Sequence, residues 1–270
     1  MPTRSRLCLA LAWTIGWSVP AGARAAAPAA AGSRTSVPAR QATGTETAGD
    51  SQRGLALVRA AAQAMGGADK LTAATNVIVK GDLVLTGPAG KVRGQSVAEV
   101  VYPDKIKSVT TLPMGRLVQA YDGRTAWVQM GGQTQELPAA MHEEMERSIL
   151  TSGGIGIVRE VLGGQAEAQA VEPVEVDGRK ADVVLWRKGS HEIRLVLDAE
   201  THLVSRLSFR ATTPQGPADI EVHVSDYRDV GGIQIPWKVV GYQNGEEYLD
   251  FEATDITLNA AIDPAVFGRP

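Results

Sequence analysis

Apolar and polar residues alternate along short segments of the chain from about residue 76 onward. Val77, Val79 and Leu83 share one parity, whereas Lys80 and Asp82 fall on the other. A period of two is typical of β-strands, because successive side chains point to opposite faces of a sheet. The turns between segments are too short for crossover connections, so the strands should pair as antiparallel hairpins. Further strands are predicted in this half at 91–101, 104–112, 115–121, 124–130 and 132–137.

The second half of the chain repeats this alternation. It is clearest where Leu203 and Leu207 share a face, with Val204 and Arg206 on the other face. The count is about 11 strands. Such alternation is typical of a sheet with one face packed against the core and the other exposed to solvent. The last strand should reach about Leu258. The predicted turns lie at 177–178, 188–189, 198–201, 214–217, 231–232 and 244–245.

Three regions show a helical pattern instead. Leu55, Val58 and Ala62 have helical spacing within a predicted helix over 51–65, and the residues after it, around Lys70, are interpreted as a turn. Pro138 should begin a second helix, which ends near 153–154, and a third covers 155–162. The second helix is amphipathic. Its apolar side carries Leu137, Met141, Met145 and Ile149, and its opposite side, expected to face solvent, carries His142, Glu143, Glu146 and Arg147.

An antiparallel sheet of about 11 strands does not stay flat, and three helices are too few to cover its apolar face. The predicted fold class is therefore mainly β (α+β): a strongly curved antiparallel sheet forming a half-open β-barrel, with helices capping the concave side. Such a barrel leaves an apolar volume that can take a small apolar ligand. The predicted ligand-cavity residues are Met141, Met145, Ile149, Leu207, Phe209, Trp237 and Phe251.

The helix that carries the methionines is a suitable lid, because flexible, polarizable side chains adapt to ligands of different shape. The alternative is that Met141 and Met145 belong to an ordinary core, since a methionine stripe at helical spacing is common there. Both interpretations stay open at the level of sequence.

The amino terminus has the layout of a secretory signal. Arg4 and Arg6 precede an apolar run over 7–19, and an A-x-A site follows at 23–25. The run is shorter than the roughly 20 residues that cross a bilayer as a helix, although a retained signal anchor is an alternative. The expected location is the periplasm. The predicted organisation is a signal peptide over 1–25, a disordered linker over 26–50 and a single domain over 51–270.

Charge and cysteine content exclude several functions. The net charge is −3, and loss of three arginines with the signal leaves −6, with basic and acidic residues interspersed. Nucleic acid is therefore not an expected partner. The one cysteine, Cys8, lies in the signal, so disulfides, a thiol nucleophile and thiolate metal sites are excluded from the mature chain.

Catalytic motifs are missing from the sequence. His142 has no second histidine four residues later, and there is no G-x-S-x-G elbow or phosphate loop. His191, His202 and His223 lie on three different predicted strands, so a metal site would need these strands to be neighbours. No catalytic residue, metal ligand or cofactor is assigned.

Three patterns follow one another in a fixed order: Y-D-G-x-x-x-W, L-D-x-x-T and D-Y-R-x-V-x-G-I-x-x-P. Together with the segments AMGGADKL, YPDKIK and NAAIDPAVF they resemble the outer-membrane lipoprotein-sorting (LolA-like, LppX-like) superfamily over roughly residues 55–268. The resemblance implies a half-open β-barrel with a helical lid, an acyl-chain cavity and no catalytic residues.

The leading functional hypothesis is a periplasmic, non-enzymatic carrier or chaperone for the acyl chains of a lipid or an acylated protein. We expect a monomer with a membrane-bound partner for loading or release. The alternative is a periplasmic sensor or adaptor that binds a protein or peptide through the same concave surface. A weaker third hypothesis is an enzyme that uses the strand histidines.

Overall fold

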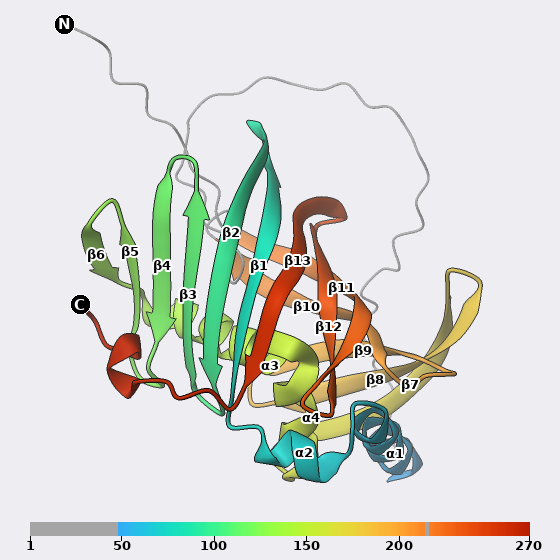
Figure 1. Cartoon of the computed structure of the whole chain (residues 1–270). Coiled ribbons are helices and arrows are strands. Elements are labelled where there is room, and N and C mark those ends of the chain that lie inside the picture. The colour runs from blue at the N-terminus through green and yellow to red at the C-terminus, as the bar shows by residue number, and fades with distance from the viewer. Residues whose placement is uncertain (1–47, 214–215) are drawn as a thin grey trace, which may run out of the picture.

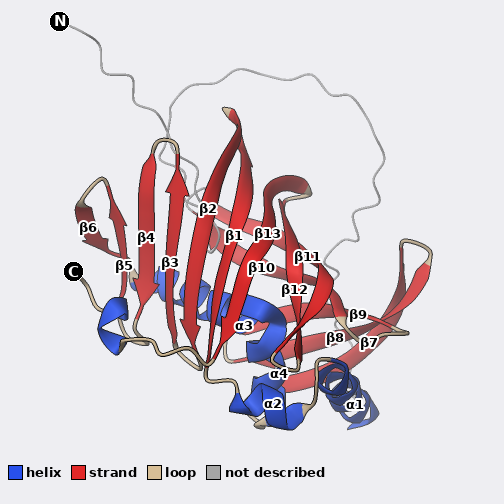
Figure 2. Cartoon of the chain, viewed as in Figure 1, coloured by secondary structure: helices blue, strands red, loops and turns tan. Residues whose placement is uncertain are grey.

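The computed structural model describes residues 48–213 and 216–270 (Figures 1 and 2). The predicted signal peptide and most of the predicted linker lie outside these residues. Helix α1 begins at Ala48, within the stretch predicted as linker. The predicted turn at 214–217 falls partly outside the described residues.

A single antiparallel sheet forms most of the described part of the chain. Its order is β6-β5-β4-β3-β2-β1-β13-β12-β11-β10-β9-β8-β7, so the two halves of the chain form two arms joined where β1 pairs with β13. The strands are β1 Asn76–Gly87, β2 Gly90–Val101, β3 Lys105–Leu112, β4 Gly115–Tyr121, β5 Ala126–Met130, β6 Gln133–Glu136, β7 Glu167–Val176, β8 Arg179–Lys188, β9 His191–Asp198, β10 Val204–Thr213, β11 Gly216–Val230, β12 Ile233–Gln243 and β13 Glu246–Leu258.

The predicted fold class is confirmed: the sheet is strongly curved, antiparallel and not closed, since β6 and β7 are its two edges. The strand count is corrected from about 11 to 13 within the described residues. The sheet also contains register shifts. One lies between Val171 and Val174 in β7, on either side of Pro173, and such bulges interrupt the period of two.

A second register shift corrects the predicted faces of β10. It lies between Val204 and Arg206, where β10 pairs with β9. The bulge puts Val204 and Leu207 together in the main hydrophobic core, although strict alternation assigned them to opposite faces. Ser205 is the extra residue of this bulge, and its hydroxyl donates to the carbonyl oxygen of Val196 at 3.2 Å.

The helices lie mainly on the concave side and at the lower edge of the sheet (Figure 1). The predicted turn around Lys70 is a short helix, α2, and the third predicted helix matches α4 at both ends. No helix in the described residues is long and apolar enough to cross a membrane. The helices are α1 Ala48–Ala64, α2 Ala68–Ala73, α3 His142–Thr151 and α4 Ile155–Leu162, with 3-10 turns η1 Ala139–Met141, η2 Ser152–Gly154 and η3 Pro264–Phe267.

Specific contacts hold the helices against the sheet. The backbone of α1 lies so close to β7 that a Cβ on Gly54 would be 2.3 Å from the carbonyl oxygen of Ala168, so only glycine fits there. The indole nitrogen of the buried Trp186 donates to the carbonyl oxygen of Ile157 in α4 at 3.2 Å. Trp186 and Ile157 belong to the largest of the three hydrophobic clusters in the described residues.

Candidate functional site

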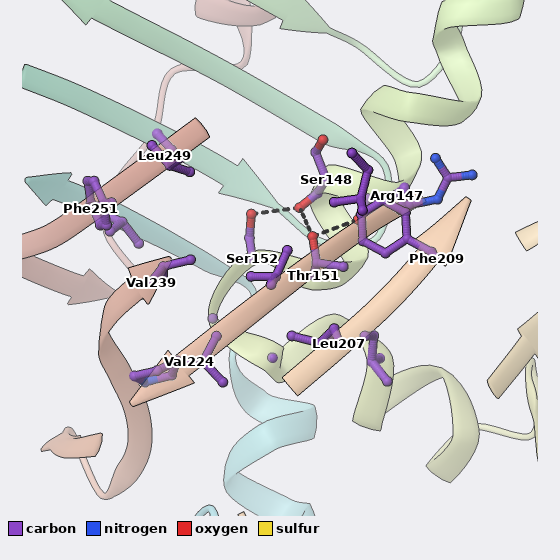
Figure 3. A pocket seen from close by; sticks show the side chains of 18 of the residues that line it. Arg147, Ser148, Thr151, Ser152, Leu207, Phe209, Val224, Val239, Leu249 and Phe251 are labelled. Atoms are coloured by element: carbon purple, nitrogen blue, oxygen red, sulfur yellow. Dashed lines mark hydrogen bonds between the residues drawn. The ribbon is translucent and has the colours of Figure 1, made fainter. Parts of the chain in front are cut away.

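A cavity of about 140 Å³ lies between the concave face of the sheet and helix α3 (Figure 3). One water molecule needs only about 10–15 Å³ on the same measure. The sheet side of the cavity is largely apolar. Its wall includes Leu207, Phe209, Val222, Val224, Val239, Leu249 and Phe251, from strands β10 to β13.

Helix α3 and the residue that follows it, Ser152, give the cavity a polar wall. Residues three and four positions apart share one side of a helix, and the cavity-lining residues of α3 follow this spacing. The Gly153-Gly154 pair, with φ of 64° and 72°, then turns the chain into α4, and both glycines also line the cavity. The polar wall consists of Glu144, Arg147, Ser148, Thr151 and Ser152.

The three hydroxyls of this wall all donate to backbone carbonyl oxygens of their own helix. Ser148 donates to Glu144 at 2.7 Å, and Ser152 donates to Ser148 at 2.7 Å. Thr151 donates to Arg147 at 3.0 Å. Because a hydroxyl has one proton, each of these oxygens presents acceptor lone pairs and no free donor to the cavity in this arrangement.

Of the seven predicted cavity residues, Leu207, Phe209 and Phe251 line the cavity and the other four lie elsewhere. Met141, Met145 and Ile149 are buried in the core, with Met145 fully inaccessible. The Trp237 ring lies beneath the guanidinium of Arg228, 4.4 Å from the ring centre. Whether the lining residues contact a ligand stays a prediction.

The position of the methionines follows from the geometry of α3. At 100° per residue, the Met141–Met145–Ile149 stripe is rotated by roughly a quarter to a third of a turn from the Glu144–Ser148–Thr151 stripe. The methionine stripe belongs to the main core, whereas the second stripe borders the cavity.

The prediction that the polar side of α3 faces solvent is wrong. Glu143 is exposed, but His142 and Glu146 are half-buried and Arg147 is 6% exposed. The sequence alone does not predict that the polar wall borders a cavity. Its i, i+3, i+4, i+7 spacing was visible, but a buried polar stripe and a solvated stripe have the same periodicity.

Glu144 and Arg147 form a buried ion pair at one end of the cavity, and their side chains are each 7% exposed. The other carboxylate oxygen of Glu144 accepts from the backbone N–H of Thr212 in β10 at 3.0 Å. The guanidinium of Arg147 lies over the ring of Phe209, 5.0 Å from its centre. The pair therefore ties α3 to β10 and adds little net charge to the cavity.

A second set of polar contacts continues from this pair. His191, in β9, lies 3.5 Å from a terminal nitrogen of Arg147 and 3.2 Å from a carboxylate oxygen of Glu146. The Tyr121 hydroxyl, in β4, donates to the other oxygen of Glu146 at 3.0 Å. Burial, assisted by the Glu146 carboxylate, raises the pKa of Tyr121 to about 12. Tyr121 therefore stays protonated, and α3 is joined to both arms of the sheet.

The strand histidines do not converge. His191 contacts α3, His223 lies beside Glu221 and the ring of Tyr242, and His202 occupies the β9–β10 turn with φ of 59°. Within the described ranges, no group of three or more His, Cys, Asp or Glu side chains is arranged to hold a metal ion.

Comparisons with solved structures identify the fold. An outer membrane lipoprotein-sorting protein domain from Vibrio parahaemolyticus matches 80% of this chain and 97% of its own, at 10% identity and a TM-score of 0.52. A LolA superfamily protein from Nitrosomonas europaea matches 80% of this chain and 97% of its own length, at 12% identity and a TM-score of 0.50. A DUF1329 family protein from Desulfovibrio piger matches 83% of this chain and 98% of its own length, at 8% identity and a TM-score of 0.54. No family model and no curated protein matches the sequence significantly.

Proposed function

We propose that this chain, which has a LolA-like fold, is a periplasmic, non-catalytic carrier for the acyl chain of a lipid or an acylated protein. The observation that carries the proposal is a cavity that the core side chains leave unfilled, with an apolar wall formed by β10 to β13. Each CH₂ group buried there would contribute about 0.8 kcal/mol. Even partial insertion of a chain would therefore give useful affinity.

The amino-terminal sequence supports the proposed location, because its basic residues, apolar run and A-x-A site are those of an export signal. A carrier of this kind needs one partner that loads its cargo and another that receives it. We therefore include a membrane-bound partner for loading or release in the proposal, with the carrier acting as a monomer.

The test is to purify the full chain from a bacterial host and to quantify extracted lipid per mole of protein by mass spectrometry. Val239 lines the cavity, whereas the next residue, Val240, lies opposite His223 and Asp250 and outside the cavity. Val239→Phe should place a ring in the cavity and lower bound lipid severalfold. Val240→Phe is the matched control and should leave it unchanged.

Two results would contradict the carrier. One is wild-type protein without lipid that also fails to bind added fatty acid. The other is an equal lipid content in the Val239→Phe and Val240→Phe variants. Capture of a specific peptide or protein by lipid-free protein would instead favour the sensor or adaptor alternative.

A further inference from the structure

The three hydroxyl groups on the polar wall offer only hydrogen-bond acceptors to the cavity. The hydroxyls of Ser148, Thr151 and Ser152 all donate to helix carbonyl oxygens, so only their lone pairs are available to the cavity. Tyr227 also lines the cavity, and its hydroxyl donates to the carbonyl oxygen of Val204 at 2.9 Å. A ligand group that lies against these oxygens gains a hydrogen bond only if it brings its own donor.

The charge along this wall restricts the ligand further. Arg147 and Glu144 are its charged members, and their charges pair with each other, although the buried Nε–H of Arg147 has no hydrogen-bond partner among the described residues. A carboxylate or phosphate would therefore meet Glu144 without an uncompensated cation, and its desolvation would be costly. A neutral donor avoids this cost, since hydroxyl and amide groups need only a hydrogen-bond acceptor.

We propose that the cavity prefers acyl chains that carry a neutral hydrogen-bond donor, a hydroxyl or an amide N–H, placed against Ser148, Thr151 and Ser152. This inference rests on the proposed function, because it assigns the polar part of the same ligand to α3 and the hydrocarbon to the strands. Figure 3 shows this division, with the labelled hydroxyl side chains on the helix and Leu207 and Val224 on the strands.

The experiment compares matched neutral probes on the purified full chain. Methyl tetradecanoate, methyl 3-hydroxytetradecanoate and tetradecanamide compete with the methyl ester of a fluorescent fatty acid, and the ratio of their affinities is measured. The second and third probes separate a hydroxyl from an amide donor. Comparing the same probes on two proteins cancels their different solubilities in water.

One lost hydrogen bond should reduce the preference for a donor-bearing chain by about fivefold, which corresponds to about 1 kcal/mol. The Ser148→Ala/Ser152→Ala variant and, separately, Thr151→Val should show this reduction. Ser225 is exposed and follows the cavity residue Val224 along β11, so Ser225→Ala is the control and should keep the wild-type ratio.

The outcomes are distinct. An unchanged ratio in both the double serine variant and Thr151→Val overturns the donor preference while leaving the carrier intact. The donor preference is also overturned if the ratios of affinity for the three probes in the wild-type protein equal those in the Ser148→Ala/Ser152→Ala variant. Failure of every probe to bind contradicts the carrier itself. Thr151→Val preserves side-chain shape, so the test stands even if the double variant folds poorly.

Discussion

Helix α3 has two buried faces with different surroundings. Met145 and Ile149 on one face pack into the main core and are almost completely inaccessible to solvent. Glu144, Ser148 and Thr151 on the other face border a cavity. The contrast shows that burial alone does not identify a ligand-facing surface. In this helix the apolar face fills the core, whereas the polar face holds a buried ion pair and borders the candidate site.

The largest expected effect comes from breaking the ion pair on the cavity face. Arg147→Met leaves the Glu144 carboxylate buried without its partner, which should lower the free energy of unfolding by about 3–5 kcal/mol. Urea denaturation measures this loss. Adding Glu144→Gln removes the unpaired charge and should recover at least half of it. Equal stability of the single and double variants would show that charge burial is not the cause.

A slightly smaller loss is expected on the methionine face. Met145→Ala removes a fully buried side chain from the core and should cost about 2–5 kcal/mol in the same assay. The affinity for fatty acid, measured on the folded protein, should change little because Met145 does not line the cavity. A large affinity loss with unchanged stability would reverse the roles assigned to the two faces.

The contact between Tyr121 and Glu146 predicts a pH dependence at the polar edge of α3. The pKa of Tyr121 is raised to about 12 in the folded protein, so the stabilisation is full below the unfolded pKa of about 10. It should be lost as the pH rises towards 12, by about 1–2 kcal/mol. Measuring the free energy of unfolding of the wild type and of Tyr121→Phe between pH 9 and 12 isolates the contribution of Tyr121 to this pH dependence. Parallel pH profiles for the two proteins would refute the assignment.

The smallest expected effect on stability comes from changing a hydroxyl residue of the polar wall. Ser148→Ala should change the free energy of unfolding by less than about 1 kcal/mol, because the lost hydrogen bond to the helix carbonyl is offset by the higher helix propensity of alanine. The measurement is again urea denaturation. A loss as large as that of Met145→Ala would make this wall structural and weaken the contrast between the faces.

Local patterns predicted much of the fold. Short turns and alternation predicted an antiparallel, curved sheet with a helical cap, and the helix predicted over 155–162 matches α4. The predicted side-chain direction is wrong where the ladder is irregular, as at Val204 in β10. Such a bulge depends on how the strand pairs with its neighbour, and the periodicity within one strand contains no information about that pairing.

The candidate site was predictable only in part. Leu207, Phe209 and Phe251 were predicted from apolar positions on strands, and they line the cavity. Arg147 was assigned to solvent because its buried partners, Glu144 and His191, become visible only in three dimensions. Trp237 was predicted to line the cavity, yet Arg228 covers its ring, and the distinction requires knowledge of the strand packing.

The most direct test of the carrier is to locate the bound chain itself. A fatty acid with a diazirine near its tail is bound to the full chain, activated by light and mapped by peptide mass spectrometry. If the cavity holds the chain, cavity residues such as Leu207, Val224 and Phe251 should be labelled, and excess fatty acid without the diazirine should suppress this labelling. Labelling confined to Val240 and other residues outside the cavity, or insensitive to competitor, would contradict the carrier proposal.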